Sequence, residues 1–206
     1  MLLQRIQQQF IDSADLKYQC AQALAPAVEA ATSALLACVT GGGKVLSCGN
    51  GASAAAAQHF AASFVGRHER ERPELAAFSL SADASVLTAL ATDFDVRAVF
   101  SRQVRALGQA GDVLLVLSTS GNSQNVIAAV EAAHERDMIV VALTGARGGR
   151  MAQLLRDTDV HICVPSEVPA RTLEVHHLVL HCLCDGVDVQ LLGLPEALSN
   201  ETENPA

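Results

Sequence analysis

A hydroxyl-rich turn at residues 118–123 is the part of the sequence best suited to chemistry. It reads Ser-Thr-Ser-Gly-Asn-Ser, follows the apolar run 113–117 directly, and is followed by the helical pattern of Val126, Ile127 and Val130. A short, branched apolar run predicts a buried strand. The first amides of a helix lack internal partners and carry partial positive charge, so a strand–turn–helix unit of this kind can bind an anion.

We interpret this turn as a binding site for a phosphate monoester. The hydroxyls that would contact the phosphate belong to Ser118, Thr119, Ser120 and Ser123. The turn has no lysine, which excludes the nucleotide-binding GxxxxGK[ST] loop. The alternative is an ordinary helix N-cap, because serine and threonine are favoured there in any protein. One hydroxyl would suffice for a cap, whereas four within six residues favour a binding site.

A second loop of similar design follows the predicted strand 44–48. It reads Gly-Asn-Gly-Ala-Ser and precedes an alanine-rich helical segment, and we expect Asn50, Gly51 and Ser53 to contact the same ligand. The loop also matches the G-x-G-x-x-A pattern of dinucleotide-binding proteins. No acidic residue ends the next predicted strand, where such a site would bind the ribose. A sugar-phosphate pocket is therefore the preferred interpretation, with plain helix–strand packing as the remaining alternative.

Apolar patterns along the rest of the chain predict an α/β fold. Helical stripes cover 2–24, 27–39, 54–65, 86–91, 99–107 and 171–192, and strand-like runs cover 44–48, 78–80, 113–117, 138–143 and 160–164. Their alternation predicts a parallel sheet covered on both faces, with ligands at the carboxyl ends of the strands. Both polar loops follow such ends, so we expect them to line one pocket. The helical pair before the first strand, within residues 1–40, predicts an oligomerisation element.

Composition narrows the possible functions. The 206 residues carry a net charge of −8 without a basic stripe, which argues against direct binding to nucleic acid or an anionic membrane. No uninterrupted apolar run reaches membrane-spanning length, and the start of the chain has no cleavable signal pattern. The six cysteines are scattered, as expected for reduced thiols. We therefore expect a cytoplasmic protein with one domain over 1–194 and a disordered acidic tail over 195–206.

Four segments resemble the sugar isomerase (SIS) domain family. They are CGNGASAAAAQHFAASFVGR (48–67), ATDFDVRAVFSRQV (91–104), GDVLLVLSTSGNSQNVIAAVEAA (111–133) and IVVALTG (139–145). Within the family, the chain is most similar to the group that contains phosphoheptose isomerase and the DnaA initiator-associating protein DiaA. The resemblance implies a three-layer αβα sandwich with a five-stranded parallel sheet of flavodoxin-like topology, and a homotetramer that binds sugar phosphates. It also implies that Asp93 contacts ligand hydroxyls, with a simple helix cap as the alternative.

Two motif positions in this sequence differ from the pattern that the resemblance implies for the isomerases of this group. The resemblance implies a catalytic glutamate in HFAEE, a glutamine in QEIH, and a zinc ion bound by these residues and the histidine of each motif. Here the first motif reads HFAAS and the second LEVH, so Ser63 replaces the glutamate and Leu173 the glutamine. Only His59 and His176 are retained. Serine cannot serve as a carboxylate base near neutral pH, and two histidines alone make a poor zinc site.

The preferred prediction from the sequence is therefore a non-enzymatic, DiaA-like adaptor that binds the replication initiator DnaA and has no cofactor. The segments QHFAAS, ERP (71–73) and CLCD (182–185) are similar to that branch, and an acidic protein suits a basic partner. The segment ATDFD (91–95) instead resembles the isomerases. A regulatory sensor of sugar phosphates is a further possibility.

The main alternative is a sedoheptulose 7-phosphate isomerase that contains zinc. In that case we expect Glu174 and His176 to supply the acid–base chemistry in place of the lost glutamate. His177 and His181 lie four residues apart on a predicted helix, a spacing that also suits metal chelation. The simpler interpretation of this second pair is a core or interface position.

Overall fold

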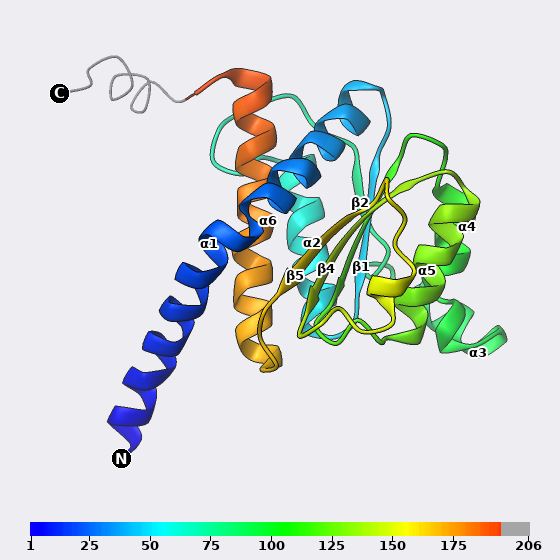
Figure 1. Ribbon diagram of the computed structural model, residues 1–206. Helices are drawn as coiled ribbons and strands as arrows, with labels where there is room; N and C mark the ends of the chain where they lie inside the picture. The colour runs from blue at the N-terminus through cyan, green and yellow to red at the C-terminus, as the bar shows by residue number, and fades with distance from the viewer. Residues whose placement is uncertain (195–206) are drawn as a thin grey trace.

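A five-stranded parallel sheet forms the centre of the protein in the computed structural model, which describes residues 1–194 (Figure 1). The strands are β1 (Val45–Gly49), β2 (Ala77–Ser79), β3 (Val113–Ser118), β4 (Ile139–Gly145) and β5 (Val160–Val164). They lie in the order β2-β1-β3-β4-β5, and every pairing is parallel. The direction of winding reverses between β1 and β3, and open parallel sheets bind ligands at such a switch point. The predicted fold class is confirmed.

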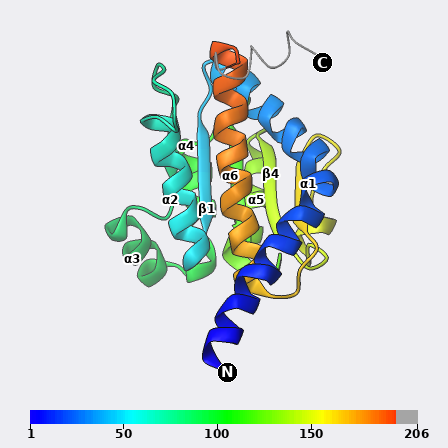
Figure 2. The ribbon, with the colours of Figure 1, turned by 90° about the vertical axis from the view of Figure 1, so that its left-hand side faces the viewer.

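Helices cover both faces of the sheet (Figure 2). One layer consists of α1 (Leu2–Thr40), α2 (Ala52–Val65) and α6 (Pro169–Leu192), and the other of α3 (Ala84–Asp93), α4 (Ser101–Leu107) and α5 (Gln124–Glu135). Successive side chains of β3 point to opposite faces of the sheet and pack against the two helical layers in turn. Leu115 and Leu117 pack in the first core, and Leu114 and Val116 pack in the second. Since both faces are covered, the whole strand is apolar and buried, as its sequence predicts.

The N-terminal segment forms one helix, so the predicted helical pair is wrong. α1 is continuous over 39 residues and contains Pro26, although proline removes a hydrogen bond from a helix interior. Leu24 is buried before the proline, and Ala31 and Leu35 are buried after it. Their packing against the sheet and α6 offsets the cost of the missing bond. Tertiary contacts therefore override a local signal for a helix end.

The first half of α1 projects away from the body of the protein (Figures 1 and 2). Its side chains Leu3, Ile6 and Phe10 are 68%, 46% and 75% exposed. Within residues 1–194, α1 is the one helix whose length and composition would allow it to cross a membrane, a test that a core helix also passes. This half of the helix therefore carries an apolar stripe that its own chain leaves uncovered.

Most other predicted elements agree with the structure to within about two residues, the usual uncertainty of element ends. The segment predicted as one helix over 99–107 differs more. A separate 3-10 turn covers Val96–Ala98, because the Asp95 carboxylate accepts a hydrogen bond from the Arg97 amide, and α4 begins only at Ser101. The predicted disordered tail, 195–206, lies outside the described residues.

Candidate functional site

The two predicted ligand loops lie side by side at the carboxyl edge of the sheet. β1 and β3 are neighbours, with Gly49 paired to Leu117, so the helices that follow them, α2 and α5, start next to each other. The Asn50 and Asn125 side chains join the loops through two reciprocal amide hydrogen bonds of 2.8 Å. The first loop is thereby fixed to the N-terminal turn of α5, at the switch point of the sheet.

In neither of these helices does the side chain of the N-cap residue bond to a backbone amide. Gly51 occupies the N-cap of α2 with φ 55°, and Ser123 occupies the N-cap of α5 without bonding to a first-turn amide. Within α5, the Asn125 side chain accepts a hydrogen bond of 3.0 Å from the Val126 amide. The Ser123 hydroxyl instead accepts a hydrogen bond of 3.3 Å from the Ser118 hydroxyl. The N-cap alternative therefore holds for the position of Ser123 but not for its bonding. The Ser53 and Ala54 amides are bonded to the Asn50 and Gly51 carbonyls, so the first-turn amides left open to a ligand are those of Ala52 in α2 and of Gln124 and Asn125 in α5.

Contacts with its neighbours fix the shape of the hydroxyl-rich turn. Gly121 has φ 64°, and a Cβ atom there would lie 1.9 Å from the carbonyl oxygen of Gly148. The Asn122 side chain donates to the Ser120 carbonyl at 2.9 Å and accepts from the Arg150 amide at 3.0 Å. The turn is therefore preorganised, which lowers the entropy cost of binding a ligand.

A cavity of about 210 Å³ opens beside this turn. It is lined by Thr119, Ser120, Asn122, Ala146, Ser166, Glu167, Pro169 and Thr172. Glu167 adds a carboxylate to the hydroxyls, and α6 begins here without a side-chain cap. Asn50, Gly51 and Ser53 do not line this cavity, so the structure brings the first loop beside the turn but not into the cavity.

Asp93 is the last residue of α3, and it is exposed. The capping alternative for this residue is wrong, because Asp83 caps the N-terminus of α3 and Asp95 caps the following 3-10 turn. Asp93 does not line the cavity beside the hydroxyl-rich turn. Its contact with ligand hydroxyls stays a prediction.

Glu174 and His176, the expected acid–base pair, have separate surroundings. The Glu174 carboxylate accepts a hydrogen bond of 2.6 Å from the Ser13 hydroxyl and pairs with Arg171 at 2.6 Å. His176 is fully buried; its Nε2 donates to the Thr144 carbonyl at 3.0 Å, and its Nδ1 has no partner. Burial lowers the pKa of His176 to about 4, so the ring is neutral near pH 7. Each side chain is engaged in structural contacts, and the structure does not join them as a pair.

The zinc ligands implied by the family resemblance do not fit a metal ion in this chain. His59 faces His181, with their Nε2 atoms 3.1 Å apart, whereas His176 lies in the core against β4. Ser63 and Leu173 supply neither a carboxylate nor an amide at the two remaining positions. His59 therefore faces His181, and not His176, which the resemblance implies as its fellow zinc ligand.

Three residues of these sites were missed in the sequence. Asn125 lies inside α5, Glu167 lies in the loop before α6, and His68 lies after α2 with its ring centroid 5.3 Å from that of His181. No local motif marks them, since each meets its partners only through tertiary packing. The four-residue spacing of His177 and His181 was the one feature of the sequence that indicated a grouping of histidines on this helix.

Comparisons with known proteins agree with this architecture. The SIS domain family profile matches residues 9–145. A phosphoheptose isomerase from Methylibium petroleiphilum is 62% identical over 94% of this chain and 96% of its own length. One from Azoarcus sp. is 56% identical over 95% of this chain and 99% of its own length. The likeness thus extends over nearly the whole of each chain.

Solved structures show the same likeness in three dimensions. Phosphoheptose isomerase GmhA from Neisseria gonorrhoeae has a TM-score of 0.87 at 49% identity, covering 91% of this chain and 99% of that one. The isomerase from Francisella tularensis has a TM-score of 0.89 at 42% identity, covering 91% and 98%. Since the profile matches most of the chain and the relatives match nearly all of it, this protein belongs to the SIS domain family.

Proposed function

We propose that this protein is a sugar-phosphate isomerase that converts a ketose phosphate, sedoheptulose 7-phosphate, into the corresponding aldose phosphate. The observation that carries the proposal is the meeting of two helix N-termini, each with open first-turn amides, at the β1–β3 switch point beside the hydroxyl-rich turn. Backbone amides and hydroxyls in this arrangement bind a phosphate monoester without a lysine. The name phosphoheptose isomerase, carried by relatives 62% and 56% identical, supports the choice of substrate.

The cavity beside the turn supplies groups for the proton transfers. In an aldose–ketose shift, a base removes a proton from C1 of the ketose while the C2 carbonyl oxygen gains one, which gives an enediol. The proton then returns at C2, and the C1 hydroxyl loses its proton to become the aldehyde. We assign the role of base to the Glu167 carboxylate. The hydroxyls of Thr119 and Ser166, which line the same cavity, exchange protons with the sugar oxygens.

Turnover of sedoheptulose 7-phosphate, followed by quantifying the aldose product, tests the proposal. Glu167→Gln is expected to lower kcat by about a hundredfold or more, because it removes the base but keeps the side-chain volume. Glu131→Gln, a matched change at an exposed carboxylate on α5, is the control. Loss of turnover in Glu174→Gln alone would restore the acid–base pair predicted from the sequence. A wild-type protein without turnover, with and without added zinc, would contradict the isomerase function.

The adaptor function predicted from the sequence gains no support from the comparisons. The relatives and solved structures described above are named as isomerases, and they do not distinguish the two branches of the family. Binding to DnaA therefore stays a prediction. A pull-down with purified DnaA at low salt checks it, and binding there would add a second role without excluding isomerisation.

We also propose that the protein assembles into a homo-oligomer, with the homotetramer of the family resemblance as the expected form. The cavity beside the turn is smaller than the 300–1,000 Å³ or so that is common for small-molecule pockets. A neighbouring subunit that closes over this edge would enlarge the enclosed space. The site is thus expected to reach its full size only in the assembly.

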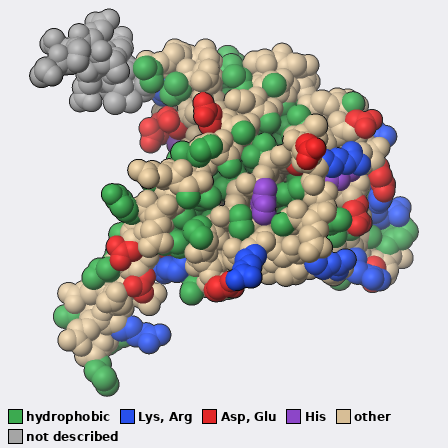
Figure 3. Space-filling model, in the orientation of Figure 1, with side chains coloured by type: hydrophobic (Ala, Val, Ile, Leu, Met, Phe, Trp, Pro, Cys, Tyr) green, Lys and Arg blue, Asp and Glu red, His purple; other side chains and the backbone are tan. Residues whose placement is uncertain are grey.

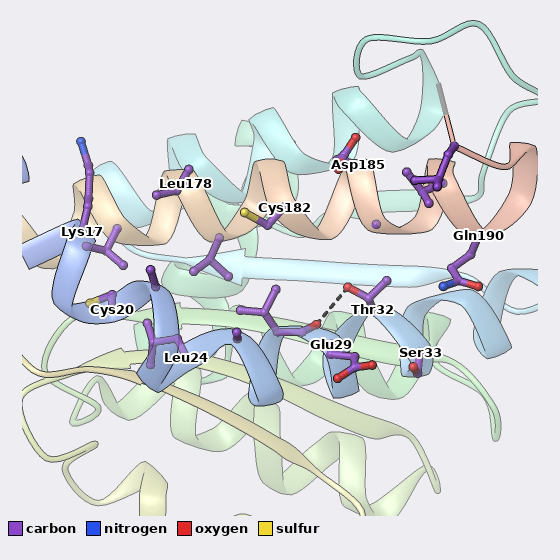
Figure 4. Close-up of a pocket in the computed structure, with 18 residues that line it drawn as sticks. Lys17, Cys20, Leu24, Glu29, Thr32, Ser33, Leu178, Cys182, Asp185 and Gln190 are labelled. Carbon is purple, nitrogen blue, oxygen red and sulfur yellow. Dashed lines mark hydrogen bonds between the residues drawn. The ribbon is translucent and has the colours of Figure 1, made fainter. Parts of the chain in front are cut away.

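The α1–α6 groove is where we expect a second copy to dock (Figure 4). It encloses about 670 Å³, and its apolar walls include Leu24 and Val28 from α1 and Val175 and Leu178 from α6. The projecting half of α1 carries further exposed apolar side chains, among them Leu3, Ile6 and Phe10, and Figure 3 shows hydrophobic side chains along this part of the protein. A helical segment of this length is marginally stable alone in water, so a partner helix is needed to cover it. Sedimentation equilibrium should show an oligomer for the wild type and smaller species for Phe10→Glu.

A further inference from the structure

The loop that follows β4 packs directly against the hydroxyl-rich turn. It covers residues 146–150, reads Ala-Arg-Gly-Gly-Arg, and is called the glycine loop below. A Cβ atom at Gly149 would collide with the Ser120 carbonyl oxygen, so the two backbones are in contact. Just after the loop, the Met151 amide donates to the Gly121 carbonyl at 3.0 Å. The shape of the turn therefore depends on where the glycine loop lies.

The imidazole ring of His161, on β5, supports the glycine loop. A Cβ atom at Gly148 would lie 2.6 Å from Cε1 and 3.0 Å from Nε2 of this ring, so the loop backbone packs on the imidazole. The carbonyl group of the same glycine packs against Gly121 in the hydroxyl-rich turn. Gly148 therefore contacts both the His161 ring and the turn, and a displacement of the ring is transmitted through one residue.

A hydrogen bond to Thr144 fixes the orientation of the His161 ring. The Thr144 hydroxyl and the ring Nε2 are 2.7 Å apart, and Thr144 is fully buried near the end of β4. Burial lowers the pKa of His161, so the ring is neutral near pH 7 and has one nitrogen that can accept a hydroxyl proton. Thr144 is also the sheet partner of Ser118, where the hydroxyl-rich turn begins. The ring is thus held to the same strand ends that carry the turn.

His161 has no place among the groups that contact the ligand. It does not line the cavity beside the hydroxyl-rich turn. It also lies beyond the match to the SIS domain family profile, which ends at residue 145. Any influence of His161 on the site must therefore pass through the glycine loop, which its ring supports.

We propose that His161 is a positioning residue for phosphate binding, because its ring, acting through the glycine loop, holds the hydroxyl-rich turn in the conformation that binds the phosphate. This inference rests on the proposed function, in which that turn is the phosphate site of the isomerase. A turn held in place before binding loses less conformational entropy when the ligand arrives. Removal of the ring therefore weakens phosphate binding without changing the proton transfers.

Titration calorimetry of the full-length protein with inorganic phosphate tests this proposal without turnover. His161→Ala is expected to weaken binding by about tenfold, roughly the loss of one hydrogen bond to the ligand. His161→Gln, whose amide can still bond to the Thr144 hydroxyl, should stay within about threefold of the wild type. His134→Ala is the matched control, because the His134 Nε2 also makes a bond of 2.7 Å, to Asp159, but at the opposite end of α5 from the turn. The control should lose stability and bind phosphate as the wild type does.

Steady-state kinetics with sedoheptulose 7-phosphate separates positioning from catalysis. His161→Ala is expected to raise KM by about the same factor of ten and to change kcat by less than about threefold. A rise in KM with kcat unchanged indicates lost binding that is common to the ground state and the transition state. A merely structural role would lower the amount of folded enzyme and leave KM unchanged.

Two results would overturn the proposal: a His161→Ala variant that binds phosphate as tightly as the wild type, or a His134→Ala variant that loses as much affinity. Circular dichroism checks that each variant folds. If His161→Ala does not fold, Thr144→Val takes its place, since it removes the hydrogen bond but keeps the side-chain volume. A wild type that binds phosphate without turning over the sugar would contradict the isomerase function and leave this role of His161 intact. Normal turnover with an unaltered His161→Ala variant would do the reverse.

Discussion

The carboxyl edge of the sheet and the α2–α6 face both carry reactive side chains, but they are assembled in different ways. At the carboxyl edge, the candidate hydroxyls lie within a single strand–turn–helix segment, residues 118–123. On the α2–α6 face, His59 and His181 meet although they are 122 residues apart. The geometry of the edge depends on local backbone structure, whereas that of the face depends on how two helices pack. A site built within one segment can be predicted from the sequence, whereas a site built by two helices that pack together can be identified only from the folded structure.

A buried ion pair holds the α2–α6 face together. The Arg72 guanidinium donates to the Asp188 carboxylate on α6 and to the carbonyls of Ser63 and Phe64 at the end of α2. The two charged side chains are 0% and 2% exposed. Arg72 thereby links both helices, those that carry His59 and His181, so its removal tests whether this face depends on packing.

The largest expected effect comes from Arg72→Met. This variant would leave the Asp188 carboxylate buried without a partner, which is expected to lower the free energy of unfolding by about 3–5 kcal/mol. Urea unfolding followed by circular dichroism measures the loss. The double variant Arg72→Met/Asp188→Leu removes both charges and should recover most of it. A double variant as unstable as the single one would instead show that Arg72 stabilises the face through the two carbonyls.

At the carboxyl edge, Gly121→Ala is expected to have a somewhat smaller effect. A Cβ atom there meets the Gly148 carbonyl oxygen, and the backbone has a positive φ. Together these should cost on the order of 3 kcal/mol of stability and disrupt phosphate binding. Gly111→Ala is the matched control, because it has φ 89° but open space around its Cβ, and it should cost about 1–2 kcal/mol. Equal losses in urea unfolding would show that the contact with Gly148 is unimportant.

Much of the fold could be predicted from the sequence, because the apolar patterns and glycine-rich turns act locally. The five strands, their parallel arrangement and the two ligand loops follow from segments such as 113–126, where strand, turn and helix signals succeed one another. The break expected near Pro26 was wrong, since packing of α1 on α6 outweighs one missing hydrogen bond. Local signals were therefore reliable wherever tertiary packing did not oppose them.

Only those parts of the candidate site that lie within one short segment of the sequence could be predicted. The hydroxyls of residues 118–123 and the loop at Asn50 lie next to each other at the switch point, although only the hydroxyl-rich turn lines the cavity. The partner of His59 was not predictable, because His176 and His181 both lie on α6 and only the rotation of that helix decides which one faces α2. In the structure, His176 faces the core and His181 faces the surface. Motif spacing alone does not contain that rotation.

His176 connects the two regions and gives the protein a predictable response to acid. Its ring lies on α6 and donates to the Thr144 carbonyl near the end of β4, and burial lowers its pKa to about 4 from the usual 6.5. The unfolded chain binds a proton near pH 6.5, whereas the folded protein resists it until pH 4. Stability therefore falls as the pH decreases through this window, by about 2 kcal/mol between pH 7 and pH 5.

Urea unfolding at several pH values measures this dependence. His176→Gln keeps a hydrogen-bond donor but cannot titrate, so its stability should be flatter between pH 6.5 and pH 4 than that of the wild type. The same slope in both proteins would mean that other groups cause the acid sensitivity. A flatter profile for the variant would show that the hydrogen bond between α6 and β4 is made by the neutral imidazole of His176.

The smallest expected effect tests whether the two ligand loops act as one site. Asn50→Ala and Asn125→Ala each break the paired amide bonds, and the buried Asn125 should cost more because it also accepts from the Val126 amide. A double-mutant cycle should give a coupling of about 1 kcal/mol in unfolding free energy. The same cycle measured on the affinity for sedoheptulose 7-phosphate should also show coupling, because a ligand held by both helix N-termini senses their relative position. Coupling in stability without coupling in affinity would mean that the phosphate contacts only one loop.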